Sequence, residues 1–391
     1  MRLVHMSDLH LGFRQYQRLT PAGLNQREAD VAAAFRRAID TTIALRPDVV
    51  LLAGDVFHTV RPSNPAILHA FQQLSRLTRA LPDAAVVLIA GNHDMPRSTE
   101  TGCILRLFSP LGIEVVDAAA RRVEFPDKGL SILAVPDVPG SRPALTPDPS
   151  AKYNILLLHG EVTGVLPPAL MAADRARTEV TPEELGAERW NYVALGDYHV
   201  YRRIAANAYY SGAIEYVSTN PWGELTEERA GRLPGKGLIE HDLATGAHRF
   251  HHIPSGRALV DLPAVSARGL TAADLDARIR EVVEGAEIDG KVVRLVVRDV
   301  PRHIVRELDH VALREYKKRA LHFYLDTRRP EFVRAHGHGA PGRRPTLADL
   351  VREKLQSRVL DSGIDREGLV ALGLRYLHEA EALEVMPVEP A

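Results

Sequence analysis

The sequence predicts an α/β fold that is followed by a smaller α+β unit and a C-terminal pair of helices. From residue 1 to about 262, short apolar runs alternate with helical patterns, which is typical of α/β layering. Beyond that point, a capped helical pattern and a β-branched strand indicate a separate α+β unit over 263–335. Residues 346–384 then carry two amphipathic helical patterns. We therefore expect three parts, 1–262, 263–335 and 346–384.

The first part contains both strand and helix signals. Asn25–Leu45 carries apolar residues at helical spacing. Asn64 is expected to cap a second helix that reaches about Thr78, because Pro65 suits the first helical position. Thr181-Pro182-Glu183-Glu184 has the form of a capping box. Seven short apolar runs are the expected strands: Leu3–Met6, Val49–Ala53, Val86–Ala90, Ile132–Val135, Ile155–Leu158, Tyr192–Leu195 and Tyr209–Ser211.

The later parts give fewer but clear signals. Thr271 is expected to cap a helix that runs through Val283, and Lys291–Val300 is expected to be a strand. Two helices are expected at Leu347–Leu360 and Asp365–Leu383, joined at 361–363. Two short helices bury little by themselves. They either pack back on their own domain or, as we hypothesise, dock on another chain.

Composition limits the classes of function. The 391 residues include 49 Lys and Arg against 50 Asp and Glu, so any nucleic-acid binding must come from local charge segregation. A single cysteine, Cys103, excludes an internal disulfide and a cysteine zinc cage, and we expect it in the core. No run approaches the ~20 apolar residues of a membrane span, and Asp8 comes too early for a signal peptide. We expect a soluble, cytoplasmic protein.

Five of the expected strands end in side chains that can bind a metal ion. Ligands gather where strand carboxyl ends meet in an α/β sheet, so we expect these side chains to converge. In an extended backbone, residues two apart face the same side, and glycines at 54, 91, 160 and 196 allow tight turns nearby. The side chains, in chain order, are Asp8 and His10, then Asp55, then Asn92, His93 and Asp94, then His159, and finally Asp197 and His199.

This set of side chains predicts the chemistry of the site. Asp, Asn and His without a thiolate suit a pair of hard-to-borderline divalent cations, and the Asp55 carboxylate can offer one oxygen to each. Two cations held about 3.5–4 Å apart would activate a bridging water and clamp both oxygens of an in-line phosphoryl displacement. The pattern therefore predicts phosphoester hydrolysis.

The same motifs resemble a known family. D-x-H, G-D, G-N-H-D, H-G and a final G-x-x-H occur in the order found in calcineurin-like metallophosphoesterases. The resemblance to SbcD-type DNA repair nucleases, the nuclease subunits of the SbcCD complex, is carried by Ser7-Asp8-Leu9-His10-Leu11-Gly12, Gly54-Asp55-Val56-Phe57-His58, Ile89-Ala90-Gly91-Asn92-His93-Asp94 and Ser211-Gly212-Ala213-Ile214. It covers about residues 1–260 and implies a β-sandwich flanked by helices, with 263–335 as a DNA-binding cap.

The resemblance also implies roles for individual residues. One metal would be held by Asp8, His10, Asp55 and His199, and the second by Asp55, Asn92, His159 and Asp197. His93 matches the histidine that assists the leaving oxygen, with Asp94 able to orient its ring, and His58 matches a histidine linked to exonuclease activity. The family usually has histidine where this chain has Asp197. Because aspartate is a competent oxygen ligand, we expect a shift in metal preference, toward Mn²⁺.

A basic stretch indicates where DNA could bind. Residues 313–344 hold nine basic and three acidic side chains, a balance of +6 on a chain of net charge −1. The alternative is an ordinary solvated face in an arginine-rich protein. The candidate DNA contacts are Arg314, Lys317, Lys318, Arg319, Arg328 and Arg329.

Five histidines outside the motifs are expected to be structural or on the surface, namely His5, His69, His251, His252 and His378.

We therefore expect a metal-dependent deoxyribonuclease, an exonuclease with possible endonuclease activity, that acts in DNA repair or processing. The resemblance implies DNA and an SbcC-type coiled-coil ATPase as partners. It also implies a homodimer, with helices such as Asn64–Thr78 and Thr101–Ser109 at the contact. Two alternatives stay open. One is a phosphatase or phosphodiesterase for small substrates, and the other is a DNA-tethering scaffold subunit whose second metal site is weakened by Asp197.

Overall fold

The computed structural model describes residues 1–96, 102–138, 143–166, 176–330, 346–358, 360 and 364–384. Two compact units divide the chain, Met1–Pro330 and Glu331–Ala391. The first unit holds the expected α/β part and the expected α+β part together. Residues 331–345, which include the end of the basic stretch, lie outside the described residues, as do 361–363 between the two C-terminal helices.

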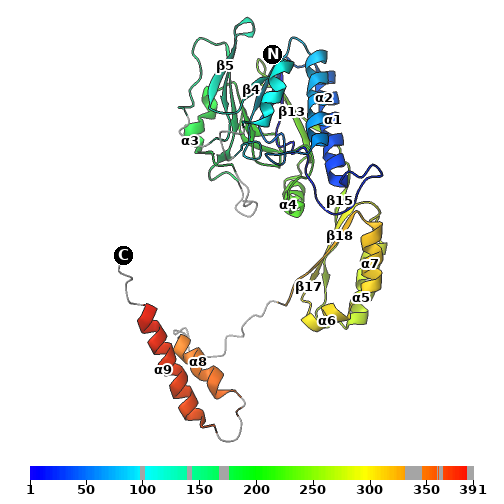
Figure 1. Ribbon diagram of the computed structural model, residues 1–391, viewed down its shortest axis with the longest axis vertical. Coiled ribbons are helices and arrows are strands. Elements are labelled where there is room, and N and C mark those ends of the chain that lie inside the picture. Colours follow the sequence, from blue (N-terminus) through cyan, green and yellow to red (C-terminus); the bar gives the residue numbers. More distant parts are fainter. Residues whose placement is uncertain are drawn as a thin grey trace. The chain divides into compact units, whose positions relative to one another are not determined.

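Two six-stranded sheets form the centre of the first unit (Figure 1). The first has the order β14-β13-β1-β2-β3-β4 and the second the order β11-β12-β10-β7-β6-β5. Strands β1 to β4 run parallel to one another, as do β6, β7, β10 and β12. The strands of the first sheet are β1 (Arg2–Met6), β2 (Val49–Leu52), β3 (Ala85–Ile89), β4 (Glu114–Val116), β13 (Gly237–Asp242) and β14 (His248–His252). Those of the second are β5 (Arg121–Phe125), β6 (Leu130–Val135), β7 (Tyr153–His159), β10 (Tyr192–Gly196), β11 (Arg202–Ala205) and β12 (Ala208–Tyr210).

Successive side chains along a strand face opposite sides of the sheet, and this alternation explains how the layers stack. In β1 and β2, Leu3 and Leu51 face the second sheet, where they join a core with Ile155 and Tyr192. Their neighbours in sequence, such as Val4, face the helices on the other side of the sheet. The two sheets therefore pack face to face as a sandwich, and the expected α/β sandwich is confirmed.

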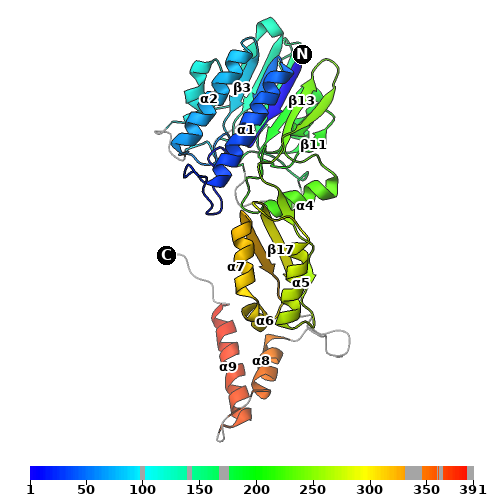
Figure 2. The same ribbon diagram turned by 90° about the vertical axis from the view of Figure 1, so that its right-hand side faces the viewer.

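Helices α1 (Gln26–Leu45) and α2 (Asn64–Ala80) cover the outer face of the first sheet (Figure 2). Asn25 caps α1 by accepting hydrogen bonds from two backbone amides. The cap of α2 is Ser63, whose hydroxyl accepts from Ala66 N, so the predicted cap Asn64 was wrong by one residue. Pro65 is then the second helical residue. The homodimer helix expected at Thr101–Ser109 begins outside the described residues, and its described part is a 3₁₀ helix, Ile104–Leu111.

Shorter elements complete this part of the chain. Thr181 and Glu184 form the predicted capping box at α3. Helix α4 lies directly before β13, and it passes near the expected metal ligands. The remaining elements are β8 (Glu161–Val162), β9 (Glu179–Val180), α3 (Pro182–Leu185) and α4 (Pro221–Gly231).

The smaller α+β part has its own sheet and core. Strand β17 (Val292–Arg298) pairs in parallel with β18 (His322–Thr327) on one side and with β15 (Leu259–Asp261) and β16 (Val265–Ser266) on the other. Since β15 belongs to this sheet, the smaller part begins before the predicted boundary at 262. Helices α5 (Ala272–Glu284) and α7 (His310–Arg319) pack on the sheet with α6 (Arg302–Glu307) (Figure 2). Thr271 caps α5 as predicted.

The second unit contains two described helices that pack against each other, α8 (Leu347–Gln356) and α9 (Arg366–Glu384). Helix α8 stops before the predicted end at Leu360, with Ser357 as its C-cap. Among the residues of this unit that the structure describes, five large apolar side chains are exposed, namely Leu347, Leu350, Ile364, Leu372 and Tyr376. Among the described residues of the whole chain, we find no helix with the length and apolar character needed to cross a bilayer.

Candidate metal centre

The carboxyl ends of five parallel strands meet at one place. In the first sheet β1, β2 and β3 are neighbours, and in the second sheet β7 and β10 are neighbours. The side chains that follow them therefore converge from both sheets. We predicted that Asp8 and His10 face the same side because the backbone there is extended, and this reason was wrong. Strand β1 ends at Met6, and Asp8 (φ 52°) and His10 (φ 44°) have left-handed rather than extended backbone.

One group of possible ligands consists of Asp8, His10 and His199. Their donor atoms lie within 4.8 Å of one another, and the three side chains are mostly buried. His10 Nε2 is 3.1 Å from His199 Nε2. Two imidazole nitrogens at this distance beside a carboxylate fit a divalent cation, because neutral imidazole and carboxylate oxygen are its usual ligands.

A second group consists of Asp8, Asp55 and His159, whose donor atoms also lie within 4.8 Å of one another. His159 Nε2 lies 3.7 Å from Asp55 Oδ1 and 3.0 Å from Asn92 Oδ1. The same nitrogen lies 3.9 Å from Asp197 Oδ1. The structure thus brings all seven predicted ligands together around Asp55, which faces both groups because its Oδ2 is 3.5 Å from His10 Nε2.

Backbone contacts hold the groups in this arrangement. His159 Nδ1 donates to Ala53 O at 2.7 Å, so its Nε2 is left to face Asp55 and Asn92. A Cβ on Gly91 would lie 2.1 Å from Asp55 Oδ1, and a Cβ on Gly196 would lie 1.9 Å from Ala53 O. These two glycines are therefore needed for close approach of the chain, rather than for the tight turns that we predicted.

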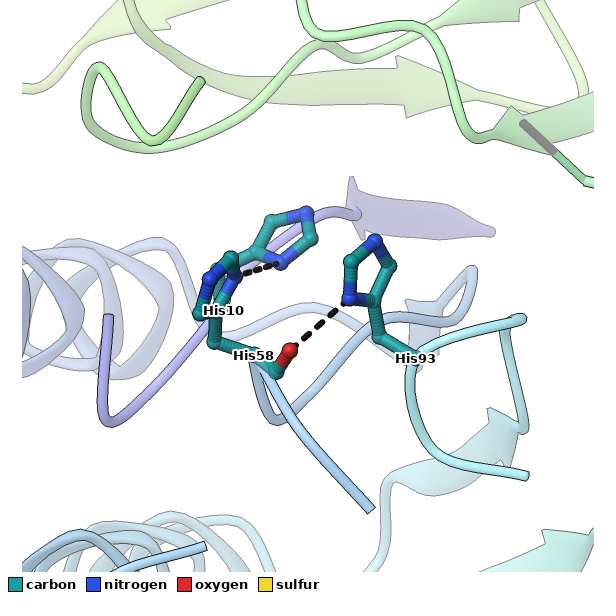
Figure 3. Close-up of side chains that lie close together, drawn as sticks. All are labelled: His10, His58 and His93. Atoms are coloured by element: carbon teal, nitrogen blue, oxygen red, sulfur yellow. Dashed lines mark hydrogen bonds between the residues drawn. The ribbon is translucent and has the colours of Figure 1, made fainter. Parts of the chain in front are cut away.

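Three histidines form a cluster at the side of these groups (Figure 3). His58 and His10 approach each other through their Nδ1 atoms at 3.3 Å, and the rings of His10 and His93 meet edge to face at 4.8 Å. His93 Nδ1 donates to the backbone carbonyl of His58 at 2.8 Å. His58 therefore lies within reach of the site, and His93 presents its ring beside His10.

The hydrogen bonds correct the expected role of Asp94. Its two carboxylate oxygens accept from the backbone amides of Val56, Phe57 and Gly91 at 2.9–3.1 Å. The fully buried side chain thus ties the loop after β3 to the loop after β2. The His58 carbonyl, rather than Asp94, is the group that orients the His93 ring.

The buried charges of the centre shift one another's pKa values. Burial raises the pKa of Asp55 to about 7, since water is excluded from its carboxylate. Burial alone would lower the pKa of His159, but the carboxylates of Asp55, Asp8 and Asp197 raise it to about 9. Burial and the neighbouring histidines hold the pKa of His10 well below its usual range. A concentration of buried acids beside neutral imidazole is an environment that favours bound cations.

Sequence reasoning missed the residues that support His199. Glu224 of α4 lies with Oε1 3.5 Å from His199 Nδ1, and Lys236 Nζ donates to His199 O at 2.8 Å. Both side chains are buried. They stand 25 and 37 residues beyond His199 and belong to no motif, so no signal in the sequence links them to the site.

The expected DNA contacts lie elsewhere, on the smaller part of the first unit. Arg314, Lys317, Lys318 and Arg319 are exposed on α7, and Arg328 and Arg329 are exposed after β18. Three of the six pair with acids, because Lys318 contacts Glu315, Arg319 contacts Asp289 and Arg328 contacts Asp326, each within 2.9 Å. These pairs reduce the free positive charge of the face.

The histidines outside the motifs have the structural surroundings that we predicted. His5 is buried and bonds to Tyr192 Oη at 3.1 Å, and His69 bonds to Ala32 O. His251 pairs with Glu240, and His252 bonds to Lys236 O. His378 is exposed on α9, and Cys103 is buried as predicted.

Comparisons with known proteins show what the chain is similar to. A family model described as calcineurin-like phosphoesterase matches residues 1–206. The chain is 28% identical over 257 residues to a protein of Methanococcus maripaludis named DNA double-strand break repair protein Mre11. The matched region covers 62% of this chain and 63% of that protein. Proteins of the same name from Methanocaldococcus jannaschii and Sulfolobus acidocaldarius are 26% identical over 255 residues and 32% identical over 172 residues. They are matched over 61% and 43% of their lengths, so the chain spans less than two thirds of each of these relatives.

The family match includes every predicted metal ligand, since all seven lie between residues 8 and 199. It covers more than half of the 391 residues, and it includes the strands of both sheets that carry those ligands. Fold, site and comparison therefore lead to one conclusion: the chain belongs to the calcineurin-like phosphoesterase family.

Proposed function

We propose that this protein is a metal-dependent nuclease that hydrolyses DNA phosphodiester bonds in double-strand break repair. The observation that supports it most is the convergence of seven oxygen and nitrogen ligands from five strand ends, with His93 beside them. The relatives described above are named as DNA double-strand break repair proteins. We propose an exonuclease of the SbcD type with possible endonuclease activity.

The donor set fits two divalent cations. Asp8, His10, Asp55 and His199 would hold one, and Asp55, Asn92, His159 and Asp197 would hold the other. Oxygen donors and imidazoles without a thiolate suit Mn²⁺, which we propose as the metal. When bound, such ions lower the pKa of water and neutralise charge on a phosphoryl group.

The protein's own groups would handle orientation and proton transfer. Because His93 Nδ1 is bonded to the His58 carbonyl, Nε2 is the ring atom that would pass a proton to the leaving oxygen. That bond fixes the direction of the ring. His58, which approaches His10 through its own ring, would keep His10 in place and contact the DNA end.

The boundary between the larger and smaller parts of the first unit supports a nucleic-acid substrate. A pocket of about 430 Å³ lies there, between the loop at Gln15, the start of α4 and the smaller sheet. Its walls include Tyr324, which is 45% exposed, and an exposed aromatic face of this kind suits stacking of a nucleotide base. The exposed basic residues of α7 would contact phosphates, and each contact would steepen the salt dependence of binding.

The second unit supports a protein partner. Its two helices expose Leu347, Leu350, Leu372 and Tyr376, the last of which is 60% exposed, and Ile364 is exposed just before α9. Apolar surface of this kind is typical of a docking site. We propose that α8 and α9 dock on a coiled-coil ATPase of the SbcC type, and that the protein acts in the cytoplasm as a homodimer.

A truncation tests the docking proposal. The full chain should be retained by the immobilised ATPase, whereas a version that ends at Arg344 should be lost, because both helices are removed. The truncated version keeps all of Met1–Pro330, so its metal content should stay unchanged and serves as the folding control. Equal retention of the two versions would contradict the proposal.

A substrate panel tests the proposed reaction. With Mn²⁺, the protein should cleave DNA substrates faster than a chromogenic phosphodiester, because only DNA engages the pocket and the basic face. Blunt duplex, hairpin and single-stranded DNA are compared at one enzyme concentration. Faster cleavage of the small substrate would favour a phosphodiesterase, and DNA binding without cleavage would favour the scaffold alternative.

A further inference from the structure

The His199 ring is held between the candidate centre and helix α4. Its Nε2 faces His10 Nε2 at 3.1 Å, on the side of the proposed metal. Its Nδ1 faces the opposite way, 3.5 Å from Glu224 Oε1. The two ring nitrogens thus have separate neighbours. A hydrogen bond to the Glu224 carboxylate would place the ring proton on Nδ1.

Glu224 is itself held by a buried lysine. Lys236 Nζ contacts the other carboxylate oxygen of Glu224, and it lies 3.1 Å from Glu228 Oε1. The same ammonium donates to the His199 backbone carbonyl and sits over the Tyr216 ring at 4.5 Å. The Lys236 and Glu224 side chains are only 2% and 7% exposed. Lys236 therefore holds both the Glu224 carboxylate and the backbone carbonyl of His199 in place.

An ordinary core ion pair does not account for this placement. Glu224 Oε1 and Glu228 Oε1 are both buried without a hydrogen bond within the described part of the chain, but of the two only Glu224 Oε1 lies within 4 Å of a His199 ring nitrogen. A buried oxygen without a full hydrogen bond costs free energy, so its position needs a reason. Its neighbour at 3.5 Å is His199 Nδ1, and hydrogen bonds of this kind are often long before the ligand is bound.

Helix α4 is also anchored at its start. Trp222, two residues before Glu224, packs with Val292 and Leu321 of the smaller part and lies 4.8 Å from the Arg294 guanidinium. The helix that carries Glu224 is thus fixed at one end by the smaller sheet. Because both its anchor and its carboxylate are buried, Glu224 has little freedom to move away from His199.

From these contacts we infer that Glu224 is a positioning residue, which accepts the Nδ1 proton of His199 so that Nε2 is directed at a divalent cation, and that Lys236 holds Glu224 for this purpose. The inference rests on the proposed function, since it requires a metal at this histidine. A carboxylate that orients a ligating histidine raises the affinity of the site for its metal, and its loss typically costs about 10–100-fold.

The test is calorimetric titration of Mn²⁺ into the metal-free full-length protein. In Glu224→Gln, one of two Mn²⁺ ions should bind about 10–100-fold more weakly, because the amide cannot serve Lys236 and His199 as the carboxylate does. Glu228→Gln is the matched control. It removes the same charge from the same lysine, but Glu228 bonds to Tyr216 rather than to His199, so Mn²⁺ should bind nearly as in wild type.

The outcomes separate the two proposals. If the wild-type protein binds no Mn²⁺, the proposed function fails. If it binds Mn²⁺ and the two variants lose affinity equally, Glu224 has a merely structural role and the inference is overturned. A second measurement needs no variant: in Zn²⁺-loaded protein labelled with ¹⁵N-histidine, His199 should be protonated at Nδ1 and ligated through Nε2. Ligation through Nδ1 would also overturn the inference.

Discussion

His93→Ala should keep its metal ions and lose nearly all nuclease turnover. The His93 ring donates to the His58 carbonyl and lies close to His10, but it is none of the seven proposed ligands, so its removal leaves those ligands in place. General acid catalysis by a positioned side chain contributes about 10²–10⁴-fold, and kcat should fall by that factor. The measurements are Mn²⁺ content and kcat on a duplex DNA substrate.

The control for this prediction is His303→Ala, which removes an exposed histidine from α6 of the smaller part. It should change neither metal content nor kcat. Full activity of His93→Ala would refute the role that we propose for this histidine. Loss of metal together with activity would instead show that His93 acts as a ligand or holds one.

Asp55→Asn should lose both metal ions, which is a larger effect than the loss of any ligand of a single ion. Asp55 Oδ1 faces His159, Oδ2 faces His10, and the backbone amide of His93 donates to Oδ1. Loss of an outer partner of a ligand costs about 10–100-fold in affinity, so loss of a ligand shared by two ions should cost more. Both Mn²⁺ content and cleavage of DNA should fall to background.

Stability provides the check that this variant is folded. Burial raises the Asp55 pKa to about 7, so above that pH the metal-free protein must hold a buried carboxylate that the unfolded chain would keep in water. The neutral amide of Asn avoids this cost. Above about pH 9, where His159 has lost the proton that Asp55 helps it to keep, metal-free Asp55→Asn should therefore unfold at a temperature no lower than metal-free wild type. Retention of two tightly bound Mn²⁺ ions by the folded variant would contradict the shared-ligand role.

The strands that carry the site could be predicted because they are buried on both faces. β2, β3, β7 and β10 contain short apolar runs, and β1 differs mainly by His5. Gly, Asp, Asn or His ends or closely follows each of them, and this pattern is visible without a structure. Edge strands lack this apolar pattern. β14, for example, is His248–His252, whose side chains are polar except for Phe250, and it forms a strand because β13 pairs with it.

The local geometry of the site could not be predicted as well. Left-handed backbone at Asp8 and His10 depends on hydrogen bonds such as His10 N to Asp55 O, which join loops far apart in the chain. The role of Glu224 depends in the same way on the contacts of α4 with Tyr198 and His199, which follow β10. Residue type and order thus predicted which side chains meet, whereas the orientation of each depends on contacts that only folding creates.

Anomalous diffraction from a Mn²⁺-soaked crystal is the most direct test of the metal centre. We expect two peaks about 3.5–4 Å apart, with Asp55 between them. The first should be bounded by Asp8, His10 and His199, and the second by Asn92, His159 and Asp197. Peaks away from these side chains, or no peak at all in a crystal of the folded protein, would contradict the two-metal centre and the nuclease that we propose from it.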